Sequence, residues 1–269
     1  MLAVGCRRGL GWARDRDWDQ GFMQKLSTAG MRALLVAGLL LLSVAASLKG
    51  FAQQAGEVDT ALIVSVDVSN SVDESRYKLQ MEGIAQALED KDVLDAILNG
   101  PQGGILFSMV TWADKPQIAI PWQRISSREE AAEVAARVRR LPRQTGEFTC
   151  VTGMLRNISD KVVPQIPAKA SRIIVDVSGD GKENCNPQEP IEAVRDELAG
   201  GGVTINGLPI LEGEDGPTLE GWYKEHVMAG PGSFVLPADG FKDFGRAIRQ
   251  KFVIEISGKL PALRHARAD

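Results

Sequence analysis

The sequence predicts an α/β protein with a doubly wound, mostly parallel central sheet, one short antiparallel edge strand and helices on both faces. Short apolar runs rich in β-branched residues alternate with segments whose apolar residues recur at helical spacing. The run over residues 61–66 is almost wholly apolar, which is typical of a strand buried on both faces in the middle of a sheet. Only a few residues separate the runs over residues 105–112 and 117–122. So short a connection permits only antiparallel pairing, which places the second run at the sheet edge.

Signals for helix starts follow several of these strands. Ser71 and Glu74 have the spacing of a capping box, which predicts that the helix after the first strand begins at Ser71. Ser127 is the expected cap of a later helix, and Thr149 and Thr152 are both candidate caps of the next one. The other expected elements are strands over residues 172–177, 203–208 and 233–236, and helices over residues 92–98, 128–141, 190–199, 219–227 and 241–256. Strand and helix therefore alternate throughout, as in a doubly wound sheet.

Chain length and charge limit the class of protein. The apolar core segments of the 269-residue chain form one continuous series, which predicts a single domain over residues 53–257 and a flexible tail over residues 258–269. Residues 1–52 hold seven Lys and Arg against three Asp and Glu, so the rest of the chain, with 24 basic and 32 acidic side chains, carries a formal charge of −8. An acidic domain repels a polyanion, so we expect no nucleic-acid partner.

The N-terminal extension, residues 1–52, contains the pattern of an export signal. Basic residues precede an apolar segment over residues 33–46, and residues 50–52 have the small-x-small ending that signal peptidases cut. We therefore expect a periplasmic or secreted protein whose mature form begins near Gln53. The apolar segment is shorter than the roughly 20 residues of a comfortable membrane span, so the chain would be membrane-bound only if the signal stayed uncleaved.

The cysteine content changes when the signal is removed. Cys6 lies in the extension, so Cys150 and Cys185 remain as the only pair. An even number of cysteines in an exported protein suggests a disulfide. Two free thiols are the alternative. One cysteine adjoins Thr149 and the other lies five residues after Asp180, so a disulfide would tie together two loops expected on the same face.

Polar side chains follow two of the predicted buried strands. Asp67, Ser69 and Ser71 come at alternate positions at the end of the first strand, and Asp180 follows the strand over residues 172–177. In open α/β sheets ligands bind beyond the carboxyl ends of the strands, so these residues lie where such a fold builds its sites. Carboxylate and hydroxyl oxygens are hard donors, which suit Mg²⁺ better than a soft metal. A carboxylate at the end of a buried strand also needs a partner, which a capping role for Ser71 alone would not provide.

Five residues together resemble a known motif. Asp67, Ser69, Ser71, Thr149 and Asp180 resemble, in order and in placement, the metal-ion-dependent adhesion site of von Willebrand factor type A domains. The resemblance implies that Ser69 and Ser71 hold one Mg²⁺ or Mn²⁺ directly, while the other three residues act directly or through water. It also implies that a protein partner offers an Asp or Glu carboxylate to an open coordination position.

The resemblance extends over roughly residues 60–256. The segments over residues 175–181, 204–208, 230–234 and 247–251 are similar to an uncharacterised family of secreted bacterial proteins of this fold. The two cysteines are not part of the general pattern and put nothing in the metal site in doubt. The resemblance therefore implies an exported, metal-dependent protein-binding module of the adhesion type, and no enzyme.

Two other functions stay open at this point. A Mg²⁺-dependent phosphoryl-transfer enzyme also places an aspartate at a strand end, but it would need a second acid two residues later, where Ser69 stands. A metal-free structural domain would use the hydroxyl groups only as helix caps. Hydrolytic triads find little support, because the only histidines are His226 and His265. The sequence thus shows no catalytic constellation, and a metal titration separates the binding module from the structural domain.

Overall fold

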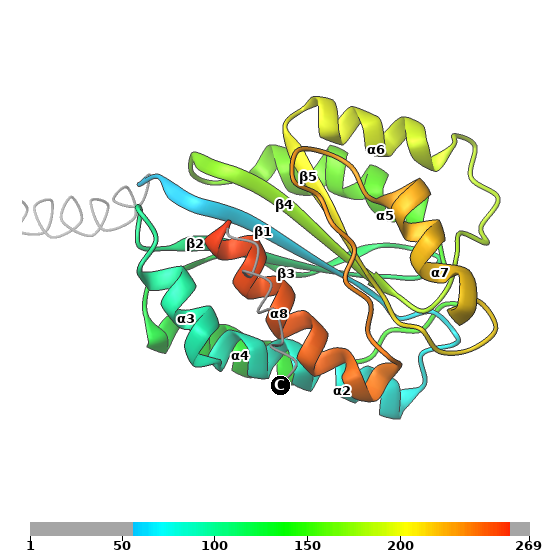
Figure 1. Ribbon diagram of the computed structural model, residues 1–269, viewed down its shortest axis with the longest axis horizontal. Coiled ribbons are helices and arrows are strands. Elements are labelled where there is room, and N and C mark those ends of the chain that lie inside the picture. The colour runs from blue at the N-terminus through cyan, green and yellow to red at the C-terminus, as the bar shows by residue number, and fades with distance from the viewer. Residues whose placement is uncertain (1–55, 259–269) are drawn as a thin grey trace, which may run out of the picture. The chain divides into compact units, whose positions relative to one another are not determined.

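A five-stranded sheet forms the centre of the fold in the computed structural model, which describes residues 56–258 (Figure 1). The strand order is β3-β2-β1-β4-β5, and within the described residues only β3 runs antiparallel to its neighbour. Both findings confirm the predicted fold class. The strands are β1 Val58–Asp67, β2 Ile105–Trp112, β3 Gln117–Ile125, β4 Ala170–Gly179 and β5 Val203–Pro209.

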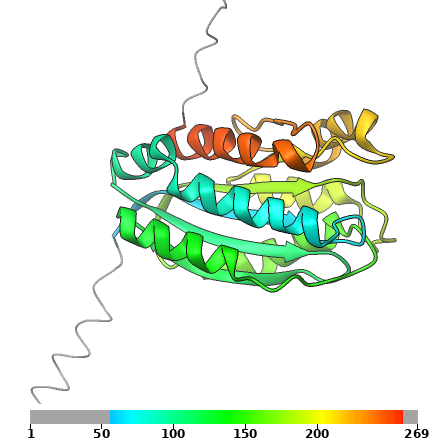
Figure 2. The same cartoon turned by 90° about the horizontal axis from the view of Figure 1, so that it is seen from below.

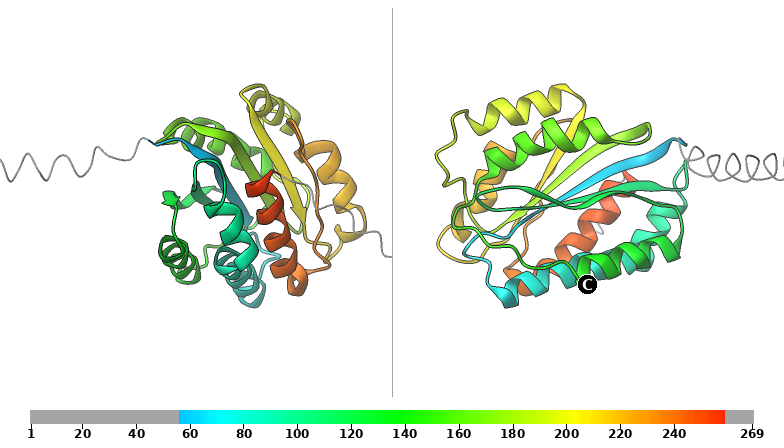
Figure 3. Two further views of the ribbon diagram at one scale, coloured as in Figure 1. Left: turned by 60° about the vertical axis from the view of Figure 1, so that its left-hand side comes forward. Right: turned by 180° about the vertical axis from the view of Figure 1, so that it is seen from behind.

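Helices cover both faces of this sheet, and each layer buries its own apolar cluster. The first layer comprises α2 Glu74–Glu89, α3 Lys91–Leu98, α4 Arg128–Arg139 and α8 Phe244–Ser257. The second comprises α5 Val151–Asn157, α6 Ile191–Gly200 and α7 Gly216–Trp222. Figure 2 shows α4, α2 and α8 side by side, and Figure 3 shows the sheet between the two layers. Shorter helical turns are η1 Ile158–Val162, η2 Val163–Gln165, η3 Tyr223–Val227 and η4 Phe241–Asp243.

Strand β1 lies in the middle of the sheet, as its composition predicts, and all ten of its residues are buried. Successive side chains enter opposite cores: Leu62 joins the cluster of the first helical layer and Ile63 that of the second. The parallel register of β1 with β4 places Val66 opposite Ser178. Asp67 and the residues that follow β4 therefore leave the sheet side by side at its carboxyl edge.

The helix after β1 begins later than the capping-box pattern at Ser71 predicts. The N-cap of α2 is Asp73, whose Oδ1 accepts hydrogen bonds from the N–H groups of Ser75 at 2.8 Å and Arg76 at 2.9 Å. A carboxylate binds these N–H groups more strongly than a serine hydroxyl does, and its charge also suits the helix N-terminus. The Ser71 hydroxyl is therefore left for other contacts.

The segment over residues 233–236 was expected to be a strand, but the structure contradicts this. Only isolated bridges connect it and its continuation to the sheet, from Val235 to Gly207 of β5 and from Ala238 to Ile210 directly after β5. Pro237 lies between these two positions and has no N–H group to donate, so a regular ladder does not form. The described part of the sheet therefore ends at β5.

Several predictions about the chain ends lie outside the described residues: the extension and signal over residues 1–52, the mature N-terminus near Gln53, and the tail beyond Gly258. Gly258 itself caps α8 with a φ of 66°, the left-handed conformation that favours glycine. Among residues 56–258 no helix is long and apolar enough to cross a membrane.

Candidate metal centre

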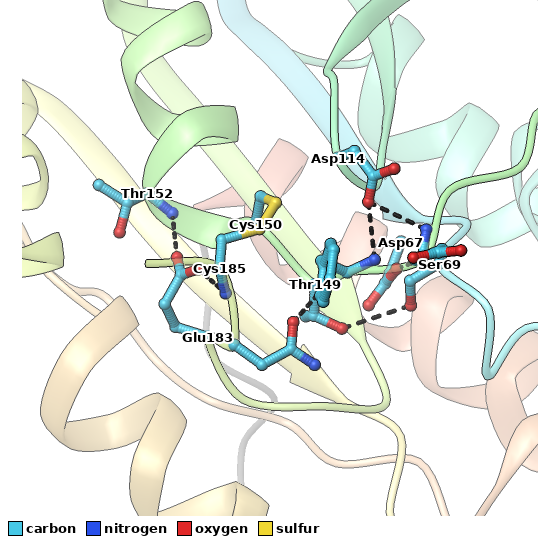
Figure 4. Close-up of a disulfide and its surroundings, with 11 residues drawn as sticks. Asp67, Ser69, Asp114, Thr149, Cys150, Thr152, Glu183 and Cys185 are labelled. Carbon is cyan, nitrogen blue, oxygen red and sulfur yellow. Dashed lines mark hydrogen bonds between the residues drawn. A yellow bond between two sulfur atoms is a disulfide. The ribbon is translucent and has the colours of Figure 1, made fainter. Parts of the chain in front are cut away.

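The structure brings all five predicted site residues together at the carboxyl edge of the sheet. Ser71 Oγ donates a hydrogen bond to Asp180 Oδ1 at 2.7 Å, and Ser69 Oγ lies 3.2 Å from Ser71 Oγ. Thr149 Oγ1 donates to Ser69 Oγ at 3.4 Å, and the N–H group of Ser69 donates to Asp67 Oδ1 at 2.8 Å. One continuous chain of polar contacts thus joins three segments that are distant in sequence, and Figure 4 shows its link between Thr149 and Ser69.

The hydroxyl groups of this cluster do not serve as helix caps. Asp73 takes the capping role expected of Ser71. Helix α5 begins after Cys150, whose side chain makes no capping bond, so Thr149 lies before the cap and turns its hydroxyl toward the cluster. The hydroxyl of Thr152 is buried with no hydrogen-bond partner. A metal-free domain that uses these hydroxyls only as caps therefore does not explain the positions of Ser71 and Thr149.

Asp67 is fully buried, and one of its two carboxylate oxygens has no partner. Oδ1 accepts the hydrogen bond from Ser69, whereas Oδ2 is buried without a hydrogen bond. Burial, and secondly the charge of Asp180, raise the pKa of Asp67 to about 7. Because an ionised carboxylate is costly to bury without a partner, this position favours a cation as its neighbour.

The raised pKa makes the stability of the metal-free protein depend on pH. The folded protein holds the Asp67 proton more tightly than the unfolded chain does, so this contribution is full below the ordinary pKa of 3.8 and is lost as the pH rises through about 7. We expect the free energy of unfolding to fall by about 3 kcal/mol from about pH 4 to about pH 7 because of this group. Denaturant unfolding in the presence of a chelator measures the fall. Asp67→Asn should lack it, and identical pH profiles for the two proteins would contradict the assignment.

Asp180 is the second carboxylate of the cluster, and its side chain has a cation nearby. Burial raises the pKa of Asp180, whereas the hydrogen bond from Ser71 and the charge of Arg76 oppose that rise. The guanidinium of Arg76 is paired with Glu212 at 2.7 Å. Arg76 therefore does not neutralise the two aspartates, and the cluster keeps a net negative charge when both are ionised.

Two glycines leave space between the oxygens of the cluster. A Cβ atom on Gly179, the last residue of β4, would stand 3.0 Å from Asp67 Oδ2. A Cβ atom on Gly181 would stand 3.3 Å from Thr149 Oγ1. A larger residue at either position would therefore place a carbon atom close to an oxygen that a cation would use. With glycine at both positions, the space beside these oxygens stays open.

The segment over residues 181–185, here called the strap, lies across the loop that carries Thr149 (Figure 4). Asn184 binds the backbone of Thr149 twice: its Oδ1 accepts from Thr149 N at 2.7 Å, and its N–H group donates to Thr149 O at 3.1 Å. Glu183 Oε2 accepts from Thr152 N at 2.7 Å and supplies the cap that α5 otherwise lacks. The strap therefore holds Thr149 at a set position relative to the loop that follows β4.

A disulfide between Cys150 and Cys185 fastens the same two segments, with the Cα atoms 5.2 Å apart. This finding confirms the pairing predicted from the cysteine count. Cys150 directly follows Thr149, and Cys185 lies five residues after Asp180. The covalent bond thus links the two loops that bring Thr149 and Asp180 to the cluster.

The turn between β2 and β3 supports the same loop from its other side. Asp114 Oδ1 accepts hydrogen bonds from Glu147 N at 2.9 Å and from Phe148 N at 2.7 Å. Sequence reasoning missed Asp114, as well as Glu183 and Asn184 of the strap. No local pattern marks these residues, because their contacts depend on which loops meet at the sheet edge.

The donor set fits a hard divalent cation. The five side chains offer carboxylate and hydroxyl oxygens, which Mg²⁺ and Mn²⁺ accept, and one buried carboxylate oxygen lacks a partner. Among the residues that the structure describes, no group of three or more His, Cys, Asp or Glu could hold a metal. A cation at this site would therefore depend on the serine and threonine hydroxyls together with the two aspartates.

Comparisons with known proteins agree with this fold. The sequence model of the family described as "Protein of unknown function (DUF1194)" matches residues 57–260. Proximal thread matrix protein 1 from the mussel byssus matches with a TM-score of 0.58 and 14% identity, over 75% of this chain and 48% of that one. A second structure of the same protein, with a zinc-occupied MIDAS motif, has a TM-score of 0.55 and 20% identity over the same shares.

A von Willebrand factor type A structure from Catenulispora acidiphila matches with a TM-score of 0.54 and 14% identity, over 74% of this chain and 43% of that one. No curated protein sequence matches the chain. The chain spans about half the length of the solved structures it resembles. At these identities the likeness concerns the fold, and the fold is that of von Willebrand factor type A domains, as the sequence resemblance implies.

Proposed function

We propose that the chain, which belongs to the family described as "Protein of unknown function (DUF1194)", is an exported module that binds a protein partner through a Mg²⁺ ion. One observation carries the proposal. Five oxygen-bearing side chains from three segments converge at one edge of the sheet, and Asp67, fully buried among them, has a carboxylate oxygen without a partner. Such an arrangement is costly for the fold alone and is useful to a cation.

Each of the five side chains has a role in this proposal. Ser69 and Ser71 would hold Mg²⁺ or Mn²⁺ directly, and Asp67, Thr149 and Asp180 would act directly or through water. Bound metal would supply an open coordination position and positive charge that attract an acidic group. The two carboxylates at most balance a dication and the hydroxyls add no charge, so an Asp or Glu carboxylate of a partner is the favoured incoming ligand. The strap would keep the Thr149 hydroxyl in place while this ligand binds.

An exposed aromatic side chain beside the cluster indicates what surrounds that carboxylate on the partner. Phe148 directly precedes Thr149 and exposes 48% of its surface. Its backbone is held by Asp114, so the ring stands on a fixed support. Aromatic side chains held in this way often anchor protein interfaces. We expect the acidic residue of the partner to have an apolar neighbour that contacts Phe148.

Export to the periplasm or the medium is part of the proposal. The disulfide supports it, because such bonds persist in oxidising compartments. The basic, apolar and small-residue regions of residues 1–52 support it as well. An uncleaved signal would keep the same module on the outer side of a membrane.

Binding is preferred to catalysis because of the residue two positions after Asp67. A phosphoryl-transfer enzyme would need an acid there, whereas this chain has Ser69, whose hydroxyl lies between those of Ser71 and Thr149. The phosphoryl-transfer enzyme is the alternative. Turnover of a phosphoester that disappears in Asp67→Asn would favour it.

Partner capture with and without metal tests the proposed function. The full exported protein is immobilised and exposed to periplasmic extract or culture medium in Mg²⁺ and then in chelator. We expect Mg²⁺-dependent capture by the wild type and none by Asp67→Asn. Asp92→Asn is the matched control, because Asp92 is an exposed aspartate on α3, and it should capture normally. Capture that a chelator does not reduce would refute the metal-dependent mechanism.

Thr149→Ala should weaken partner binding more than Mg²⁺ binding. The Thr149 hydroxyl is uncharged and makes the longest contact of the cluster, 3.4 Å to Ser69, so its loss should lower Mg²⁺ affinity by no more than about tenfold. Because Thr149 adjoins Phe148 on the side where we place the partner, partner affinity should fall further. Calorimetry with Mg²⁺, followed by partner titration, measures both losses. Thr152→Ala is the control: it removes a buried hydroxyl without a partner and should change neither Mg²⁺ affinity nor partner affinity. If Thr149→Ala lowered Mg²⁺ affinity and partner affinity equally, a role of Thr149 in partner binding would be refuted.

A further inference from the structure

A second unpartnered oxygen lies beneath the candidate metal centre and points to a residue that no motif includes. The Tyr223 hydroxyl is buried without a hydrogen bond, as is Asp67 Oδ2. A Cβ atom on Gly179 would stand 2.9 Å from the tyrosine oxygen and 3.0 Å from Asp67 Oδ2. Both oxygens thus border the same small space, which is open because residue 179 is a glycine.

The protein holds Tyr223 firmly in this position. Tyr223 is the first residue of η3, directly after α7, and it is 0% exposed. Its ring lies on β5 at Gly207, where a Cβ atom would stand only 2.7 Å from the ring carbon Cδ1. Trp222 packs edge-on against the ring, with centroids 5.6 Å apart. Gly207 on β5 therefore leaves room for the ring, and Gly179 on β4 leaves room for the hydroxyl. The position of Tyr223 in η3 fixes the ring against β5.

A packing role alone does not explain the hydroxyl. Phenylalanine would fill the same space without a buried polar atom, and a buried hydroxyl with no partner costs stability. Once Asp67 is ionised, as a cation ligand is, its nearby carboxylate oxygen can only accept, and a phenol can donate. Donor and acceptor therefore face one gap, and neither of them makes a hydrogen bond to another residue.

We infer that Tyr223 is a positioning residue of the metal centre: its hydroxyl donates to Asp67 Oδ2, directly or through one water, when Asp67 serves a bound cation. This inference rests on the proposed function. Ser69 N already orients Asp67 Oδ1. A donor at the second oxygen would fix the carboxylate plane and leave lone pairs of both oxygens toward the cation. Hydrogen bonds to metal-binding carboxylates from outside the coordination shell have this effect in proteins generally.

The chain offers a matched control, because Tyr77 and Tyr223 are its only two tyrosines. The Tyr77 hydroxyl donates to the carbonyl oxygens of Leu141 at 3.1 Å and Pro142 at 3.2 Å, and Tyr77 packs in the first helical layer. Tyr77→Phe should therefore lower the melting temperature and leave Mg²⁺ affinity unchanged.

Tyr223→Phe should instead lower Mg²⁺ affinity by about 10- to 100-fold. The melting temperature of Tyr223→Phe in chelator should equal or exceed that of the wild type.

Calorimetric titration with Mg²⁺ and thermal unfolding in chelator test both variants beside the wild type. A second measurement needs no variant: with ¹³C-labelled tyrosine, Mg²⁺ should shift the Cζ signal of Tyr223 and not that of Tyr77. Wild-type Mg²⁺ affinity in Tyr223→Phe, or an unmoved Tyr223 signal in a protein that binds Mg²⁺, would overturn this inference alone. No Mg²⁺ or Mn²⁺ binding by the wild type would overturn it together with the proposed function.

Discussion

Replacing Asp67 with asparagine should abolish Mg²⁺ binding and make the metal-free protein more stable at neutral pH. The substitution keeps the shape of the side chain and an acceptor for Ser69 N, but it removes one of the two charges that would hold the cation. Removing a residue that contacts the metal only indirectly typically lowers metal affinity by about 10- to 100-fold. The loss of Mg²⁺ affinity in Asp67→Asn should be larger. The gain in stability follows from burial, which raises the pKa of Asp67 to about 7 and so makes its ionised form costly in the metal-free fold.

Calorimetry with Mg²⁺ and thermal unfolding with and without the ion measure both effects of Asp67→Asn. Mg²⁺ should raise the melting temperature of the wild type and of Asp92→Asn, and should have no effect on Asp67→Asn. If Asp67→Asn bound Mg²⁺ as tightly as the wild type, the cation would have to lie elsewhere on the protein.

Removing the disulfide should have the largest effect on stability. Cys150 and Cys185 are 35 residues apart, and closing a loop of that length stabilises the fold by about 4 kcal/mol in the chain-entropy model. The double variant Cys150→Ser, Cys185→Ser should lose that amount in denaturant unfolding. It should also bind Mg²⁺ more weakly, because only non-covalent contacts would then hold the strap: the hydrogen bonds of Asn184 and Glu183 and the contacts of Lys182 with Asp215.

The effect of a reducing agent separates the disulfide from the serine substitutions. Reduction should lower the free energy of unfolding of the wild type to about that of the double variant, and should leave the double variant unchanged. Two free thiols in the unreduced, denatured mature protein would show that the bond does not form.

The central strand and the residues at its end could be predicted because their signals are local. A run of buried residues identifies β1, and the polar residues directly after it identify the sheet edge, so Asp67, Ser69 and Ser71 followed from position alone. Asp180 followed in the same way from its place after the strand over residues 172–177. Thr149 needed the resemblance to a known motif as well, since nothing near it in the sequence separates a site residue from a helix cap.

Other features depend on contacts between distant segments and leave no local signal. The start of α2 was misplaced because Asp73 competes with Ser71 for the same N–H groups and binds them more strongly. Tyr223 looks like an ordinary aromatic residue of a helix in the sequence. Its hydroxyl borders the same space as Asp67 Oδ2 because glycines occur at the facing positions of two neighbouring strands. The strap residue Asn184 likewise gains its role from the loop folded against it.

A crystal structure of the full exported protein grown with Mn²⁺ tests the metal centre most directly, because Mn²⁺ replaces Mg²⁺ in oxygen sites and gives an anomalous signal. We expect one anomalous peak at the carboxyl edge of the sheet, about 2.1 Å from the hydroxyl oxygens of Ser69 and Ser71 and lost in Asp67→Asn. A peak at another place on the protein, or none at this edge at saturating Mn²⁺, would contradict a metal-dependent binding site there.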